Sequence, residues 1–139
     1  MRRGLHIGAY GVSYHLVRED QTVRHILPGS CLEQRGEPVL ATGFLVAILE
    51  NACWRILSPY LQMHETAVGV DFTLRHTAPA LPDDVLHVVA ACTEIANSND
   101  VSWMVEARNL RTGEVVGSLR HHSLRVMDRA RFHRRLHRL

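Results

Sequence analysis

The longest apolar pattern in the chain runs through residues 39–61 and has the spacing of a helix. Its apolar residues recur three and four positions apart, which places them on one face; they are Leu45, Ile48, Leu49, Ala52, Cys53 and Ile56. Thr42 is the predicted N-cap, because its hydroxyl can accept a hydrogen bond from an unpaired amide. Pro59 predicts that the helix ends near Leu57.

Alternating apolar and polar positions predict strands on both sides of this helix. The first expected strand lies within residues 11–19, with Val12, Tyr14 and Leu16 on one face. The other four follow the helix, at residues 66–77, 84–95, 101–110 and 114–127. The turn sequences NSND and RTGE indicate antiparallel connections. The segment before the helix, residues 21–38, is predicted to begin extended and to continue as an irregular connection.

This order of one strand, one long helix and four strands predicts an α+β fold. An antiparallel β-sheet would wrap around one long central helix. We expect a single domain over residues 1–139, with a basic C-terminal tail from about residue 128. Because one helix and one curved sheet leave a core that a second copy could complete, we expect a homodimer; a tetramer stays open.

The composition is that of a soluble globular protein, with 46% hydrophobic and 22% charged residues. No apolar run reaches the ~18 residues of a membrane-spanning helix, and the first residues lack the apolar segment of a secretion signal. We therefore expect a cytoplasmic protein without a membrane partner. The three cysteines are odd in number and widely spaced, which disfavours a disulfide framework and a cysteine zinc site, and no metal is expected.

Glu50 places a carboxylate inside the most apolar helix of the chain. At about 100° per residue it falls on the shoulder of the apolar stripe, beside Leu49. No residue one turn away on the helix is basic. An ionised carboxylate there loses hydration unless another segment donates to it. Glu50 therefore either reaches solvent at the helix edge or has a chemical function.

Residues 41–61 closely resemble the fluoroacetyl-CoA-specific thioesterase family, which has the hot-dog fold. The residues that carry the resemblance there are Thr42, Gly43, Glu50, Ala52, Cys53, Arg55, Pro59, Tyr60 and Leu61. Residues 22–25, Gly69 and residues 76–78 also fit, and the likeness covers nearly the whole chain. It implies a hot-dog thioesterase that forms a dimer with active sites at the subunit interface.

The resemblance implies that Thr42, Glu50 and His76 are the catalytic residues. A hydroxyl, a carboxylate and an imidazole can orient a nucleophile and transfer protons. Gly43, near the helix N-terminus, would offer amides to a developing oxyanion. Gly69 would let the backbone approach the acyl group. Whether Thr42, Glu50 or an activated water attacks the carbonyl stays open.

The spacing of Thr42 and Glu50 raises a geometric problem. Eight residues correspond to about 12 Å along a continuous helix, and the two side chains leave it on different faces. They cannot share a hydrogen bond on one regular helix. Either Thr42 lies before the helix and the chain turns back, or the active site combines residues from two chains.

The loop before the helix departs from the family pattern. The fluorine-selective enzymes carry aromatic residues there as a lid over the acyl pocket, whereas residues 27–38 contain none. Gly36 occupies the lid position nearest the helix and cannot fill a pocket. We predict hydrolysis of a short or small acyl thioester without selectivity for fluoroacetyl-CoA. Gly36 is one predicted substrate-binding position; His121, expected to face the sheet interior, is another.

The expected substrate is an acyl-CoA or an acyl-carrier-protein thioester, with coenzyme A as part of the substrate and no other cofactor. The basic tail is interpreted as a solvated end in preference to a contact with coenzyme A phosphates or nucleic acid, because no nucleic-acid motif accompanies it. An alternative function is a non-catalytic acyl-CoA-binding hot-dog dimer. The presence of Thr42, Glu50 and His76 together favours the hydrolase.

Overall fold

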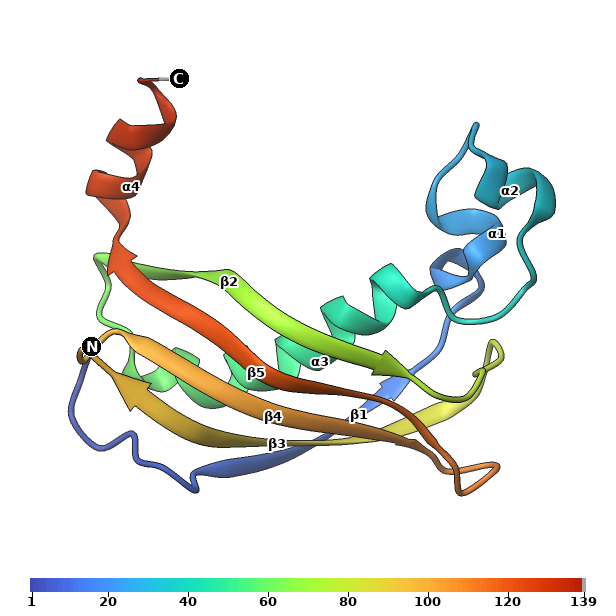
Figure 1. Ribbon diagram of the computed structural model, residues 1–139, viewed down its shortest axis with the longest axis horizontal. Coiled ribbons are helices and arrows are strands. Elements are labelled where there is room, and N and C mark those ends of the chain that lie inside the picture. Colours follow the sequence, from blue (N-terminus) through green and yellow to red (C-terminus); the bar gives the residue numbers. More distant parts are fainter. Residues whose placement is uncertain (139) are drawn as a thin grey trace.

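The computed structural model describes residues 1–138, and its five strands form one sheet in the order β1-β3-β4-β5-β2 (Figure 1). All neighbouring strands are antiparallel. The strands are β1 (Tyr10–Leu16), β2 (Glu65–His76), β3 (Val85–Ala96), β4 (Asp100–Asn109) and β5 (Val115–Asp128). The four later strands confirm the predicted ranges to within one residue at each end, whereas β1 ends three residues earlier than predicted.

The long helix α3 (Thr42–Leu57) lies along the concave face of the curved sheet, which confirms the predicted α+β architecture (Figure 1). It ends at Leu57, where a short 3-10 turn containing Pro59 follows, as predicted. The N-cap is Ala41, so the prediction of Thr42 as the cap is wrong. The backbone amide of Ala41 donates to the carbonyl of Gln21. This bond fixes the extended chain up to Ala41 and makes Thr42 the first helical residue.

The segment before α3 is more ordered than its sequence indicates. It contains a 3-10 turn η1 (Glu19–Gln21) and two short helices, α1 (Val23–Ile26) and α2 (Cys31–Arg35). The extended start predicted for residues 21–38 is confirmed only at Thr22, which forms an isolated bridge with Leu40; the residues after it are helical. α2 has a local cap in Ser30, whose hydroxyl accepts from the amide of Glu33, whereas α1 has no side-chain cap.

The basic C-terminal segment forms a further helix, α4 (Arg129–Leu136). Asp128 caps it by accepting from the amide of Arg131. Residue 139, the last of the predicted tail, lies outside the described residues. Among residues 1–138, no helix is long and apolar enough to cross a membrane.

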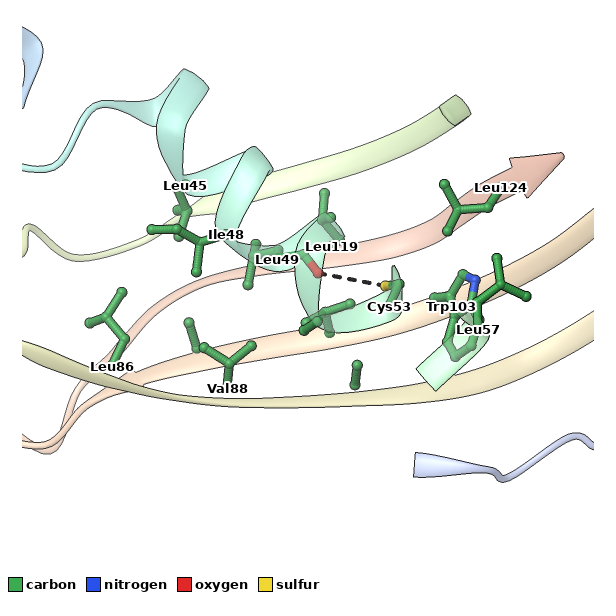
Figure 2. Packing of buried hydrophobic residues seen from close by; sticks show 14 of the residues in the cluster. Leu45, Ile48, Leu49, Cys53, Leu57, Leu86, Val88, Trp103, Leu119 and Leu124 are labelled. Atoms are coloured by element: carbon green, nitrogen blue, oxygen red, sulfur yellow. Dashed lines mark hydrogen bonds between the residues drawn. The ribbon is translucent and has the colours of Figure 1, made fainter. Parts of the chain in front are cut away.

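The core lies between α3 and the concave face of the sheet (Figure 2). Leu45, Leu49, Cys53 and Leu57 of α3 are fully buried there. They pack against residues of β3, β4 and β5, among them Leu86, Val88, Trp103, Leu119 and Leu124. Each fully buried large side chain contributes about 1.5–3 kcal/mol. Burial raises the pKa of the Cys53 thiol, which is therefore protonated and part of the packing.

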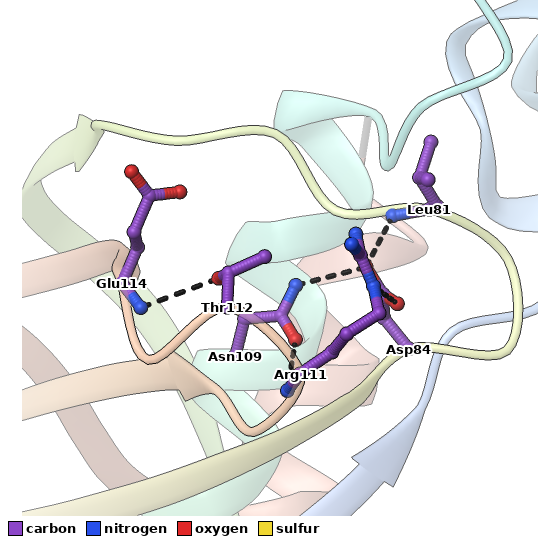
Figure 3. Close-up of polar contacts among 6 residues, drawn as sticks. All are labelled: Leu81, Asp84, Asn109, Arg111, Thr112 and Glu114. Atoms are coloured by element: carbon purple, nitrogen blue, oxygen red, sulfur yellow. Dashed lines mark hydrogen bonds and ion pairs between the residues drawn. The ribbon is translucent and has the colours of Figure 1, made fainter.

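A buried polar cluster fastens the loop before β3 to the β4–β5 turn (Figure 3). The carboxylate of Asp84 accepts from the amide of Leu81, from Asn109 Nδ2 at 2.8 Å and from Arg111 Nη2 at 2.9 Å. These bonds, above all those from Arg111, hold the pKa of Asp84 well below its usual range. The cluster thereby anchors the loop that follows the C-terminal residue of β2, His76.

Candidate active site

Thr42 and His76 meet at the N-terminal end of α3, although 34 residues separate them in the sequence. A hydrogen bond of 2.9 Å joins the Thr42 hydroxyl to Nδ1 of His76, the last residue of β2. Burial lowers the pKa of His76, so its imidazole is neutral at neutral pH. The unpaired amides of the first turn of α3 lie beside this pair and favour negative charge there.

An apolar groove opens beside Thr42, with a volume of about 400 Å³. Its walls come from α1, α2 and the start of α3: Val23, Ile26, Leu27, Leu32, Ala41, Thr42 and Gly43. Gly43 faces this groove; the nearest atom to a Cβ placed there would be Ile26 Cδ1, at 3.9 Å. The groove therefore combines an aliphatic surface, a hydroxyl and helix amides in one place.

Gly36 does not line this groove. It ends α2, and a Cβ there would lie 2.6 Å from Val23 Cγ1 and in contact with the carbonyl of Leu32. Glycine is therefore required at this position because α2 packs closely against α1. Gly36 therefore has a packing role and does not lie with the other candidate site residues.

Glu50 projects from the middle of α3, and its carboxylate is contacted by Trp54 of the same helix and by groups from β2 and β5. Its side chain is 31% exposed. Trp54 Nε1 donates to Oε1 at 3.4 Å, and Nε2 of His122 lies 3.4 Å from Oε2. A Cβ at Gly69 would lie 3.4 Å from Oε2, so the backbone of β2 passes directly beside the carboxylate. Glu50 and Gly69 are thus neighbours, as expected for parts of one site.

A cavity of about 380 Å³ lies in front of this carboxylate. It is lined by Glu50, Gly69, Val70, Asp71, Phe72 and His122. The Phe72 ring stands edge-on to the His122 ring, with centroids 5.9 Å apart. His122 is completely buried, and its ring nitrogens have no hydrogen-bond partner within residues 1–138. Burial lowers the pKa of His122, while the charge of Glu50 acts in the opposite direction.

His122 is a functional candidate that the sequence analysis missed, and the expectation for His121 is wrong. His121 is exposed and has a φ of 53°, whereas His122 faces the interior. The register of β5 shifts against both β2 and β4 near this point, so a bulge changes which residues point inward. Counting back in steps of two from the buried Leu124 would have identified His122.

The described chain holds two separate groups of candidate residues. Thr42 and His76 lie at the start of α3, and Glu50 lies with Gly69 and His122 about two turns further on, some 12 Å along the helix axis. Because Thr42 is itself the first helical residue, the chain does not turn back to bring it to Glu50. The first of the two explanations for their spacing is therefore excluded.

Comparison with known proteins identifies the family of the chain. The model of the fluoroacetyl-CoA-specific thioesterase family matches residues 17–128. The fluoroacetyl-CoA thioesterase of Streptantibioticus cattleyicolor is 33% identical over 109 residues, which are 78% of each chain. A structure of the fluoroacetyl-CoA thioesterase FlK superposes with a TM-score of 0.89, at 29% identity over 97% of each chain. A thioesterase superfamily member from Thermus thermophilus gives a TM-score of 0.81, at 29% identity over 98% of this chain and 93% of that one. The chain therefore belongs to the fluoroacetyl-CoA-specific thioesterase family and is a thioester hydrolase with the hot-dog fold.

Proposed function

We propose that the protein hydrolyses the thioester of a short or small acyl-CoA to the free acid and coenzyme A. The observation that carries this proposal is the Thr42–His76 hydrogen bond at the helix N-terminus, beside an apolar groove. The names of the relatives support coenzyme A as the thiol. The three cysteines are all free, which suits the reducing cytoplasm as the site of action.

The proposed active site combines two copies of the chain. β2 is an edge strand, and residues 69–73 are all exposed, including the apolar Val70 and Phe72. An apolar edge strand readily pairs with another strand. If two β2 strands pair antiparallel with Phe72 opposite the partner's Thr73, the partner's His76 lies opposite Gly69. Such a homodimer unites Glu50 of one chain with the Thr42–His76 pair of the other.

Each group has a chemical role in this composite site. The nucleophile is a water that Glu50 deprotonates, or Glu50 itself, with the Thr42 hydroxyl as the third candidate. It adds to the carbonyl carbon, and the amides at the start of α3 stabilise the resulting oxyanion. The C–S bond then breaks and the thiolate of coenzyme A leaves. Where Glu50 or Thr42 is the nucleophile, a water then hydrolyses the acyl-enzyme, which releases the free acid and restores the side chain. Neutral His76 holds Thr42 in place and can accept its proton.

The acyl groove predicts a broad preference among small acyl groups. Its lining contains aliphatic side chains and no aromatic lid. We expect kcat/KM for acetyl-CoA to lie within about tenfold of that for fluoroacetyl-CoA, because exchanging one hydrogen for fluorine is a smaller change than the single methylene that an aliphatic pocket distinguishes by about 10–200-fold. Butyryl-CoA, which is two methylenes longer than acetyl-CoA, should also be hydrolysed. Free-thiol release with the three substrates measures this.

Two results of the substrate panel would change the proposal. A strong preference for fluoroacetyl-CoA would contradict the predicted broad selectivity while leaving thioester hydrolysis intact. Absence of turnover on every acyl-CoA and on acyl-carrier protein would contradict the hydrolase and favour the acyl-CoA-binding dimer.

The pH dependence of hydrolysis should show an acid limb that His76 causes. Burial lowers the pKa of His76 below the ordinary imidazole value of about 6.5. The neutral imidazole, which holds Thr42 and can accept its proton, is therefore present at pH 7. Below the His76 pKa the neutral fraction falls, and kcat/KM should fall with it by about tenfold per pH unit. The residual activity of His76→Gln should lack this limb. Persistence of the limb in that variant would show that a group other than His76 causes it, such as the Glu50 carboxylate or His122, whose pKa burial also lowers.

A further inference from the structure

The C-terminal helix α4 and the ends of β5 and β2 enclose a second, basic groove of about 690 Å³. Glu65, Asn99 and residues of β5 form its floor. Five arginines and one aromatic residue also line the groove: Arg125, Arg131, Phe132, Arg134, Arg135 and Arg138. In Figure 1, α4 stands at the end of the sheet where β2 begins. The groove is separate from both groups of candidate catalytic residues.

The positive charge of this groove is largely unbalanced. Arg125 is paired with Asp100, with Nε and Oδ1 2.8 Å apart. Glu65 is paired with the amino group of Met1 at 2.6 Å. Within residues 1–138, the four groove arginines contributed by α4 and the residues after it form no ion pair. Asp128 also lines the groove, where it accepts from the backbone amide of Arg131 and forms no ion pair among the described residues. The groove therefore holds more guanidinium groups than carboxylates, and the unpaired ones are available to an anion.

The charge distribution of the whole chain is consistent with an anion-binding groove at α4. Residues 129–138 include five arginines and no acidic residue, whereas the formal net charge of the chain is only +2. The rest of the chain is therefore net negative, and α4 is the place where an anionic ligand is attracted.

The groove lies at a suitable distance from the Glu50 cavity. Glu65 belongs to the groove and Gly69 to the cavity, and both are on β2. Four residues of a strand span about 13 Å. The amide of Arg129, the first residue of α4, donates to the carbonyl of His64 at 2.8 Å, which holds the helix next to the start of β2. This separation is comparable with the length of an extended pantetheine arm.

We propose that the α4 groove binds the phosphate groups of coenzyme A while the thioester lies beside Glu50. This inference rests on the proposed function, which supplies coenzyme A as the ligand. Guanidinium groups bind phosphate oxygens through paired, charge-assisted hydrogen bonds. Phe132 offers an apolar wall on which the adenine ring can stack. The tail is then a substrate-binding element, in contrast to the solvated end that its sequence alone favours.

The test measures binding of coenzyme A and of pantetheine, which has no phosphate, by calorimetry. The variant is Arg134→Ala with Arg135→Ala. The matched control is Arg18→Ala with Arg108→Ala, which removes the same charge from exposed sites elsewhere. We expect the α4 variant to bind coenzyme A about tenfold or more weakly, a change that loss of one charge-assisted contact would produce. Its affinity for pantetheine, and both affinities of the control, should match those of the native protein.

Several outcomes would overturn the inference. The α4 variant could bind coenzyme A with native affinity, or it could lose as much affinity for pantetheine as for coenzyme A. The control variant could also lose as much affinity for coenzyme A as the α4 variant does. Replacement of both arginines by lysine should recover part of the affinity, because the charge is kept. These measurements do not require turnover. Failure of the proposed hydrolysis would instead appear as absence of thiol release by the native protein.

Discussion

Replacing Glu50 by glutamine should reduce thioester hydrolysis by about 10³-fold, the size of effect expected when a catalytic base is removed. Glutamine has nearly the same shape and can still accept the hydrogen bond from Trp54 Nε1, but it carries no charge and cannot take a proton. The packing of α3 is unaffected, because Glu50 lies outside the buried row of Leu45, Leu49 and Cys53. Free-thiol release and a thermal melt of the same protein measure the two effects.

The control for this variant is Glu106→Gln, the same change at an exposed carboxylate on β4. It should retain native turnover. If Glu50→Gln also retained turnover to within about tenfold, Glu50 would be a carboxylate that merely reaches solvent at the helix edge, the other explanation for its place in an apolar helix. A loss of turnover accompanied by a lower melting temperature would indicate a structural role.

The parts of the fold that could be predicted are those with a repeating pattern long enough to be seen. α3 shows its apolar stripe over 16 residues, and β2 to β5 are 10 to 14 residues long, enough for stretches of alternation to be recognised on either side of the bulges. α1 and α2 have four and five residues, which is about one turn, so no period exists to detect. The helix start was misplaced by one residue because a long-range bond from Ala41 to Gln21 decides it, and no local cap signal reports such a bond.

The candidate site was partly predictable for a different reason. Glu50 was found because a carboxylate conflicts with its apolar surroundings, and Thr42 and His76 because of the family resemblance. The hydrogen bond between Thr42 and His76 depends on how the end of β2 packs against the start of α3, which the spacing of the two residues in the sequence does not reveal. The interior position of His122 was missed because a bulge in β5 breaks the alternation: Leu119 and Leu124 are both buried although they are five positions apart, and only the alternation from Leu124 includes His122.

Mixing two inactive variants should restore activity, because the proposed site takes Glu50 from one chain and His76 from the other. In a dimer of one Glu50→Gln chain and one His76→Ala chain, one site carries both substitutions and the other carries neither. Random reassociation makes half of the dimers mixed, so turnover should recover to about a quarter of the native value. The measurement is free-thiol release after the two proteins have been dissociated and reassociated together.

The matched control mixes Thr42→Ala with His76→Ala. These two residues are bonded within one chain and belong to the same half of the site, so every site in the mixed dimer retains one substitution and no recovery is expected. Recovery in this control, or none in the first mixture, would contradict the composite site. Only a site shared between chains makes the two mixtures differ, and such a site also explains how residues about 12 Å apart on one helix act on one thioester.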